Sequence, residues 1–336
     1  MVYKCHYPNN SLKSARGAKR SPLHEPLAAA GAYFRDVSGW ESPGWFQPGV
    51  RSPDPGPLTW GRPAWFHHWE AEHVACREEV VLIDMSFMSK FLVQGRDAGR
   101  VLNRISTANV DGACEEITYT QWLNDSGCLE ADLTVGKLTE DSFLVIVTDT
   151  MHRHAMTWLR RSISDDAHAF VTDVTGGMAQ INIQGPRSRD LLQAVTSVDM
   201  GNDAFPFRTL REIDIGYARV TCSRMTYVGE LGYELFVPTE HAAHVYDVLQ
   251  EAGLAYGLRH AGLYALGSLR MEKGYRDYGH DMDNTDSIVS CGLGFTCDFA
   301  KEQPFVGQPS VEKLIAAGTP STRLLQIKLN DPQPLM

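Results

Sequence analysis

The segment 129–135 alternates strictly between apolar and polar side chains. This period of two predicts a β-strand with one apolar face and one polar face. The polar face carries Glu130, Asp132 and Thr134. Asp is uncommon in strands, because it packs poorly on a pleated surface and is costly to bury as a charge. The pattern therefore favours a strand that turns its carboxylates toward a ligand, with a solvated edge strand as the alternative.

Hydrophobic periodicity outlines further elements on either side of this segment. Apolar and alternating runs predict strands at residues 80–83, 90–93 and 142–147, and a hairpin formed by 218–227 and 232–237. Apolar residues at helical spacing predict helices at about 69–79, 239–252 and 260–275. Strands and helices interspersed in this way indicate an α+β chain.

The two ends of the chain differ from its middle. Residues 1–65 are rich in proline, glycine and tryptophan, which predicts a loop-rich lead-in. Residues 323–329 alternate like the first strand of a further sheet. Because a lone strand does not form a stable sheet, we expect that a C-terminal domain has been cut off.

A pattern of strand, Gln-Gly turn and amphipathic helix occurs twice, at a spacing of 90 residues. The first copy begins at Phe91 and turns at Gly95, and the second begins at Ile181 and turns at Gly185. Two copies of one unit indicate two related halves with a ligand site between them. Chance similarity is the alternative, because such units are common.

Composition and charge narrow the class of partner. With 43% hydrophobic and 21% charged residues, the composition is that of a globular protein. The 41 acidic and 31 basic side chains give a formal net charge of −10, which opposes binding to nucleic acid or to an anionic membrane surface. No apolar run reaches the roughly 20 residues of a membrane span. The expected partner is a small molecule or another protein.

Cysteine usage and the N-terminal segment bear on the compartment. Seven cysteines lie scattered without a CxxC pair, which is typical of reduced thiols. Residues 1–24 carry basic side chains and no acid, as a mitochondrial transit segment does, but Pro8, Gly17 and Pro22 interrupt any long amphipathic helix. We therefore expect a cytoplasmic protein, with the mitochondrial matrix as the alternative.

Residue spacing argues against two common kinds of site. His67, His68, Glu70 and His73 are possible metal ligands, but His68 and His73 are five residues apart and do not share a helical face. No GxGxxG motif follows a predicted strand and opens a helix. The sequence therefore predicts neither a metal site nor a dinucleotide site.

Four side chains of the second half suit a flat heterocycle with an acidic tail. Tyr227 can stack or hydrogen-bond, Glu234 can accept two N–H donors from an aminopyrimidine-like edge, and Arg270 can hold a carboxylate in a bidentate fork. Tyr278 lies in the same polar segment as Arg270. Each of them, taken singly, also fits a structural role such as a hairpin aromatic, a rim charge or a helix salt bridge.

Four ordered segments carry a family resemblance. Residues 84–88 read DMSFM, 123–135 read LNDSGCLEADLTV, 227–234 read YVGELGYE, and 268–279 read SLRMEKGYRDYG. With these segments the chain resembles, from about Pro22 to its end, the folate-binding module of the glycine cleavage T-protein (aminomethyltransferase). The four segments are most similar to that module as it occurs in the C-terminal half of dimethylglycine dehydrogenase and sarcosine dehydrogenase.

The resemblance implies roles for eight side chains. Asp132 would be the catalytic carboxylate beside the reactive folate nitrogens, and Tyr227 and Glu234 would bind the pterin. The remaining residues would complete the folate site: Met88, Tyr119, Thr134, Arg270 and Tyr278. Two positions depart from the family pattern, Cys128 where a second glycine is usual and Asp298 where a lysine is common, and they affect local loop and tail contacts.

The resemblance also implies a fold. The family forms a ring of ferredoxin-like α+β units with folate in the central opening, followed by a C-terminal β-barrel. Residues 1–24 would then be the tail of a missing flavin-domain region, and 25–320 the folate-binding domain with related halves at about 66–160 and 170–300. Residues 321–336 would be the first strand of a truncated barrel domain.

The implied function is tetrahydrofolate-dependent one-carbon transfer, as in the folate half of a dimethylglycine or sarcosine dehydrogenase-like oxidoreductase. Tetrahydrofolate would be the cofactor, and FAD would belong to a missing or separate domain. The partners would be an iminium derived from a small methylated amine and a flavin-containing domain or subunit. The alternatives are a non-catalytic module like the pyruvate dehydrogenase phosphatase regulatory subunit and a stand-alone aminomethyltransferase.

Overall fold

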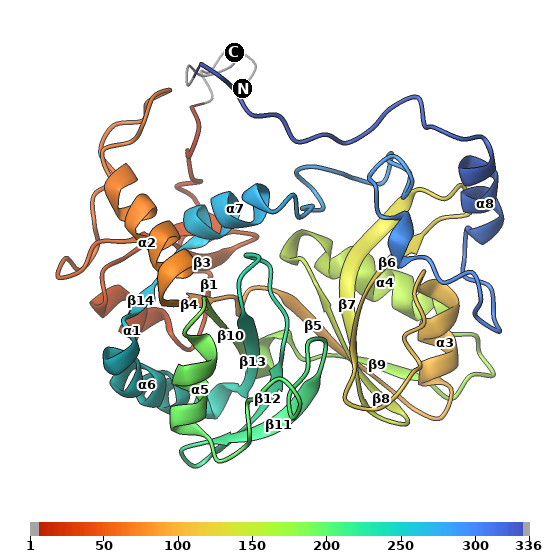
Figure 1. Ribbon diagram of the computed structural model, residues 1–336, viewed down its shortest axis with the longest axis horizontal. Coiled ribbons are helices and arrows are strands. Elements are labelled where there is room, and N and C mark those ends of the chain that lie inside the picture. Colours follow the sequence, from red (N-terminus) through yellow and green to blue (C-terminus); the bar gives the residue numbers. More distant parts are fainter. Residues whose placement is uncertain (1–6, 332–336) are drawn as a thin grey trace.

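Two large β-sheets face each other at the centre of the molecule, and helices cover their outer sides (Figure 1). The computed structural model describes residues 7–331. Cys5 and the outer ends of the predicted segments 1–24 and 321–336 lie outside the described residues. Ile146 of one sheet and Phe236 of the other belong to one small apolar cluster between the sheets. The architecture confirms the α+β class predicted from the sequence.

The first large sheet has six strands in the order β11-β12-β13-β10-β4-β14. Their bounds are Leu210–Ile215 (β11), Ala218–Ser223 (β12), Gly232–Pro238 (β13), Met178–Gln184 (β10), Val80–Asp84 (β4) and Leu258–His260 (β14). Only the pairing of β14 with β4 is parallel. Three helices pack on its outer face: α1 (His24–Ala29), α5 (Ser188–Val195) and α6 (Ala242–Gly253).

The second large sheet has five antiparallel strands in the order β6-β7-β8-β5-β9. Their bounds are Ile117–Leu123 (β6), Leu129–Thr139 (β7), Ser142–Val147 (β8), Ser89–Gln94 (β5) and Phe170–Asp173 (β9). Helices α3 (Ala98–Ile105) and α4 (His152–Ser162) cover its outer face. The apolar side of the alternating segment 129–135 packs there, as its pattern predicts.

The chain exchanges one strand between the two sheets. β4 precedes β5 along the chain, yet it lies in the six-stranded sheet between β10 and β14. In return, β9 follows the other four strands of the five-stranded sheet and completes its edge by pairing with β5. The two sheets are therefore not built from two separate lengths of sequence.

The N-terminal region forms a third, three-stranded sheet in the order β1-β3-β2. Its strands are β1 (Lys19–Arg20), β2 (Ala32–Val37) and β3 (Trp40–Phe46). The prediction of a loop-rich lead-in is therefore wrong for this part of the chain. Ser38 and Gly39 have positive φ values of 49° and 86°, so this dipeptide forms the two-residue turn of the β2–β3 hairpin. Pro43 and Gly44 lie inside β3 at a register shift, where their usual strand-breaking effect is accommodated.

Two further helices pack together beside β4, and a third lies near the C-terminus. They are α2 (Phe66–Glu78), α7 (Leu263–Glu272) and α8 (Gln308–Ala316). Glu72 of α2 is buried, and its two carboxylate oxygens accept the backbone N–H groups of Phe46 at 2.6 Å and Gly262 at 2.8 Å. Burial raises the pKa of Glu72 to about 8. This carboxyl group joins α2 to β3 and to the start of α7.

Both copies of the internal repeat form the predicted strand, turn and helix, as β5–α3 and β10–α5. Their turn glycines, Gly95 and Gly185, have φ values of 127° and 122°. A Cβ atom at Gly95 would lie 2.3 Å from the carbonyl oxygen of His168, and one at Gly185 would lie 2.5 Å from that of Glu79. Both turns therefore require glycine. The boundaries proposed for the two halves stay predictions.

Some predicted boundaries are wrong in detail. The strand expected at 218–227 ends at Ser223, and residues 224–231 form a loop. The helix expected from residue 260 begins at Leu263, because residues 258–260 pair with β4 as β14. Residues 323–329 form no strand, since no neighbouring strand in the described part of the chain pairs with them. Residues 7–331 also contain five 3-10 turns: η1 (Asp149–Met151), η2 (Thr175–Gly177), η3 (Thr239–His241), η4 (Leu254–Tyr256) and η5 (Gly294–Thr296).

The cysteines among residues 7–331 are all free thiols. None of the helices in this part of the chain has the length and apolar character that crossing a bilayer requires.

Candidate functional site

The inner face of the five-stranded sheet is polar at the centre of β6 and β7. Asp132 of β7 lies opposite Gln121 of β6, and Thr134 lies opposite Tyr119. Residues opposite one another in an antiparallel pair share a face, so these four side chains point to the same side. The intervening Leu133 packs on the other side, into the core with α3 and α4. The alternation along β7 therefore places three predicted site residues together.

Gln121 holds the carboxylate of Asp132. The Nε2 of Gln121 donates a hydrogen bond to Oδ1 of Asp132 at 2.8 Å. The Oε1 of Gln121 in turn accepts hydrogen bonds from the hydroxyl groups of Thr296 and Thr107. The Asp132 carboxylate fixes the amide orientation, because the opposite orientation would point the amide oxygen at another oxygen acceptor. Asp132 thus has an oriented partner that favours its charged form.

Burial sets the protonation of Asp132. It raises the pKa of the Asp132 carboxyl to about 6, while hydrogen bonds from Gln121 and Tyr119 oppose that rise. The Tyr119 hydroxyl has its own pKa raised by burial and by the neighbouring Asp132 charge, so it stays a neutral donor. A carboxyl group that titrates just below neutral pH is well matched to proton transfer.

Glu130 and Tyr278 lie at the end of β7 nearest the 270–296 loops. Glu130 accepts a hydrogen bond from Asn124 Nδ2 at 3.1 Å, and its other oxygen lies 2.9 Å from His154 Nε2. Tyr278 is buried, and its hydroxyl donates to the Leu129 carbonyl oxygen at 3.3 Å. Tyr278 therefore attaches its loop to β7 beside the Asp132 face.

Glu234 is the acidic centre of the facing sheet. On β13 it lies opposite Asn182 of β10 and Ser223 of β12. Asn182 Nδ2 and Ser223 Oγ each donate to one oxygen of Glu234, both at 3.4 Å. Burial raises the pKa of Glu234 to about 7, and these two donors and the charge of Lys90 oppose the rise.

Lys90 of β5 is fully buried near this inner space. Its Nζ donates to the carbonyl oxygens of Ser86 at 3.0 Å and Met88 at 2.8 Å. Burial lowers the pKa of Lys90 to about 7, and the charges of Asp84, Asp173 and Glu234 act against that shift. Met88 is partly buried and packs against two apolar clusters. One contains Ile83 of β4, and the other contains Ile146 of β8 and Phe236 of β13.

Tyr227 lies in the loop 224–231, and Arg270 lies in the last turn of α7. The Tyr227 hydroxyl donates to the Arg276 carbonyl oxygen at 2.6 Å, and its ring stacks on Tyr275 with centroids 6.0 Å apart. The Arg270 guanidinium is buried, pairs with Asp281 and donates to the Tyr275 carbonyl oxygen at 3.1 Å. In this structure Arg270 holds its own loop, so its predicted fork for a ligand carboxylate stays a prediction.

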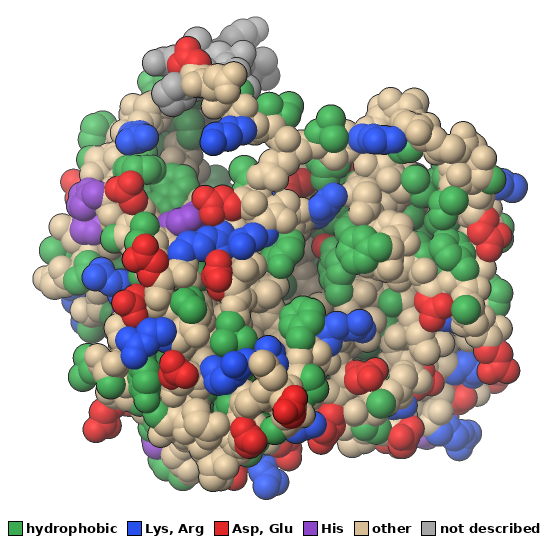
Figure 2. All heavy atoms as spheres, in the orientation of Figure 1, with side chains coloured by type: hydrophobic (Ala, Val, Ile, Leu, Met, Phe, Trp, Pro, Cys, Tyr) green, Lys and Arg blue, Asp and Glu red, His purple; other side chains and the backbone are tan. Residues whose placement is uncertain are grey.

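The molecule is hollowed between its two large sheets (Figure 2). A groove of about 490 Å³ lies on the side of the N-terminal sheet, and it is lined by Trp40, Phe87 and Ser89 among others. His152 also lines this groove, with its Nδ1 2.9 Å from Ser89 Oγ and its Nε2 3.0 Å from Asp173 Oδ2. None of the eight predicted site residues lines this groove.

Residues 23–301 match the family model described as the GCVT N-terminal domain. The chain belongs to the GcvT family. This confirms the resemblance to the glycine cleavage T-protein noted in the sequence.

Relatives of this GcvT chain include an oxidase and a dehydrogenase. It is 38% identical over 334 residues to 4-methylaminobutanoate oxidase (formaldehyde-forming) of Paenarthrobacter nicotinovorans, covering 99% of this chain and 40% of the relative. It is 31% identical over 372 residues to the mitochondrial sarcosine dehydrogenase of Homo sapiens, again covering 99% of this chain and 40% of the relative. The chain therefore spans about two-fifths of the length of these relatives.

A solved structure shares the GcvT fold. The aminomethyltransferase T of the glycine cleavage system from Bartonella henselae superposes with a TM-score of 0.74 at 21% identity, covering 89% of this chain and 75% of that chain. At this identity the likeness shows the fold alone.

The structure places further polar residues beside the candidate site that the sequence pattern did not single out. Gln121 donates to Asp132, and Asn182 donates to Glu234. Lys90 is buried on β5 between Ser89 and Phe91. A lysine at the first position of the predicted strand 90–93 was the one available signal, because a buried strand seldom carries a charge.

Proposed function

We propose that this GcvT domain binds tetrahydrofolate between its two large sheets and transfers a one-carbon unit to it. The observation that carries the proposal is the pair of partly buried carboxyl groups, Asp132 and Glu234, on the facing inner sides of the two sheets. Each has a pKa raised by burial and each is held by an amide donor. Titratable groups perturbed in this way gather at functional sites.

The residues beside Glu234 fit a pterin ring. Gln180 and Gln184 lie on the same face of β10 as Asn182, and the Oε1 atoms of both glutamines are buried without a hydrogen-bond partner. A buried acceptor without a donor costs stability. The N–H and NH₂ groups of an aminopyrimidine edge would provide such donors. With the carboxylate of Glu234 these oxygens form an acceptor-rich strip.

Asp132 would carry the chemistry. Bound tetrahydrofolate would supply the nitrogen that takes up the one-carbon unit. The Asp132 carboxylate, fixed by Gln121, would stabilise the positive charge of an incoming iminium and accept the proton that the attacking nitrogen releases. Its pKa of about 6 leaves it ionised and able to accept a proton at neutral pH.

The iminium would come from a flavin-containing domain or subunit of a dimethylglycine or sarcosine dehydrogenase-like oxidoreductase. The names of the relatives support this, because an N-methylated amine is the substrate that they print. A regulatory module would need the shape of the site but no oriented charge at Asp132, so the Gln121 contact favours the enzyme. A stand-alone aminomethyltransferase is the weaker hypothesis, because these two relatives are an oxidase and a dehydrogenase of N-methylated amines.

Calorimetry with tetrahydrofolate tests binding directly. Glu234→Ala removes the central acceptor of the strip, and we expect its affinity to fall by about 5- to 150-fold, as for a buried polar partner worth about 1–3 kcal/mol. Glu212→Ala on β11 is the matched control, because its side chain is 64% exposed. The proposal is wrong if the parent does not bind tetrahydrofolate or if Glu234→Ala binds it as tightly as the parent.

A further inference from the structure

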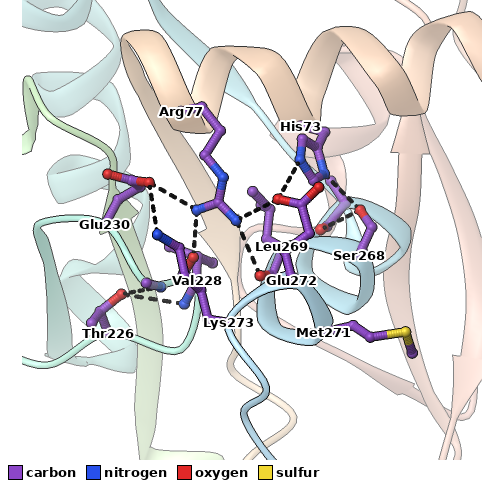
Figure 3. A network of polar contacts seen from close by, with 12 residues as sticks. His73, Arg77, Thr226, Val228, Glu230, Ser268, Leu269, Met271, Glu272 and Lys273 are labelled. Atoms are coloured by element: carbon purple, nitrogen blue, oxygen red, sulfur yellow. Dashed lines mark hydrogen bonds and ion pairs between the residues drawn. The ribbon is translucent and has the colours of Figure 1, made fainter. Parts of the chain in front are cut away.

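Arg77 is the centre of a polar network on the surface where α2 meets α7 and the loop 224–231 (Figure 3). It lies near the C-terminal end of α2. Each terminal nitrogen of its guanidinium makes two contacts. Nη1 donates to the carbonyl oxygen of Val228 at 2.6 Å and to Glu230 Oε1 at 2.9 Å. Nη2 donates to the carbonyl oxygen of Leu269 at 3.1 Å and to Glu272 Oε2 at 2.9 Å.

The two nitrogens serve two different segments. Nη1 holds only the loop 224–231, and Nη2 holds only the end of α7. Val228 directly follows Tyr227, and Leu269 directly precedes Arg270. The guanidinium therefore joins the loop 224–231 to the end of α7, one residue away from each predicted ligand.

The joined segments meet again at the Tyr227 side chain. Its hydroxyl bonds to the Arg276 carbonyl oxygen, and its ring stacks on Tyr275. Both contacts depend on the loop 224–231 staying close to the turn that follows α7. Arg77 joins the two segments from α2, and the more exposed Lys273, with Nζ 3.7 Å from Glu230 Oε1, adds a second link between them.

The contacts of Arg77 are more buried than those of an exposed ion pair. Its side chain is 19% exposed, and the two carbonyl groups it holds belong to residues that are fully buried. Charge-assisted hydrogen bonds to buried carbonyl groups are stronger than exposed pairs. Thr226 Oγ1 also accepts the N–H groups of Val228 and Gly229, both at 3.2 Å, so the loop has a defined shape at the point where Arg77 holds it.

The α7 side of the network is supported in the same way. Glu272 is also held by His73 Nε2 at 3.2 Å. Ser268 Oγ accepts the indole N–H of Trp69 at 3.0 Å and lies 2.8 Å from His73 Nδ1. Contacts other than those of Arg77 therefore also hold the end of α7 against α2.

We infer that Arg77 is a positioning residue that sets the Tyr227 ring for the ligand, acting through the backbone of Val228 and Leu269. The inference rests on the proposed folate-binding function. Arg77 itself does not touch the ligand in this assignment. Lysine cannot replace it, because one ammonium group cannot make two pairs of contacts pointing in different directions.

The test compares Arg77→Met with Arg187→Met by calorimetry with tetrahydrofolate and by thermal unfolding of the full chain. Arg187 is a matched control, because it also joins two elements, through Glu79 at 3.3 Å and the Ala255 carbonyl oxygen at 3.5 Å, but on the outer side of the sheet. We expect Arg77→Met to weaken binding about 10-fold or more and Arg187→Met to stay within about 2-fold, at a similar loss of Tm. Equal loss of affinity in the two variants, or none in Arg77→Met, overturns the inference.

A double-variant cycle separates positioning from general loosening. If Arg77 acts through Tyr227, adding Arg77→Met to Tyr227→Ala weakens binding no further than about 2-fold. Additive losses overturn the assignment. Arg77→Lys, which keeps the charge, is expected to bind about 5-fold or more weakly and provides the same test if Arg77→Met does not fold. A parent chain that fails to bind tetrahydrofolate instead overturns the proposed function itself.

Discussion

The amide of Gln121 donates to the Asp132 carboxylate at 2.8 Å, and its own oxygen is occupied by the hydroxyl of Thr296. Rotating the amide would turn its oxygen, which has no hydrogen to donate, toward the carboxylate. The carboxylate therefore meets a donor whose direction is fixed before any ligand arrives. Such preorganised donors cost no reorganisation when charge develops in a reaction.

Gln121→Leu is expected to raise the pKa of Asp132 further, because it removes a hydrogen bond that favours the carboxylate. The acid limb of the rate of methylenetetrahydrofolate formation should move to higher pH, with the rate above that limb less affected. A pH profile with a supplied flavin domain measures this. An acid limb at the parent's position would show that Gln121 does not set the charge of Asp132.

Asp132→Asn keeps the shape of the side chain and removes its charge. Supplied with a flavin domain, this variant should bind tetrahydrofolate nearly as well as the parent but form methylenetetrahydrofolate about 10-fold or more slowly. Free formaldehyde should accumulate, since an uncaptured iminium hydrolyses. Both products can be assayed in one reaction. An unchanged yield would remove the catalytic role and move the regulatory alternative into first place.

Folate affinity should depend on pH through Glu234. Burial raises the pKa of this carboxyl to about 7, so below that pH it takes up a proton and loses one acceptor position. We expect tetrahydrofolate binding to weaken as pH falls from about 8 to about 6. Glu234→Gln should bind weakly throughout and lose this dependence. Calorimetry of the two proteins at three pH values is sufficient, and parallel pH curves would contradict the assignment.

Because of Lys90, the folded chain should become more stable as the pH rises above about 7. Burial lowers the pKa of Lys90 to about 7 in the folded chain, from the ordinary lysine value of 10.5, so between these values the unfolded chain binds a proton that the folded chain does not. The free energy of unfolding therefore gains a contribution that rises with pH across this window, by at most about 1.4 kcal/mol per pH unit. Urea unfolding at pH 7 and pH 9 measures it.

Lys90→Met should lose this rise, because methionine fills the space without a titrating group. Lys313→Met on the exposed α8 is the control, and it should keep the rise of the parent. The same slope in Lys90→Met as in the parent would show that Lys90 does not titrate in this window.

The strands were predictable where one rule decided them. The segment 129–135 alternates because one side packs on α3 and α4 while the other faces the inner space, and the period of two records both. The repeat was equally readable, because Gly95 and Gly185 each occupy a backbone conformation that a side chain would clash with. The family resemblance came from these same segments.

Long-range contacts decided what the sequence did not reveal. β3 contains Pro43 and Gly44, and it is a strand only because β2 and β1 pair with it on its two edges. Gln121 is separated from Thr296 by 175 residues in the chain, so no local pattern connects them. Arg270 was expected to face a ligand, and a pairing with Asp281 across a loop is visible only in three dimensions.

The exchange of β4 and β9 between the sheets affects how the chain could be divided. A cut in the connection at residues 164–167 would leave β4 in one fragment and its partners β10 and β14 in the other. The same cut would separate β9 from β5. Each fragment alone would expose the edge that the missing strand covers, and β4 is buried along its whole length. The two fragments are therefore expected to be insoluble apart and to assemble when expressed together, as a reciprocal strand swap would.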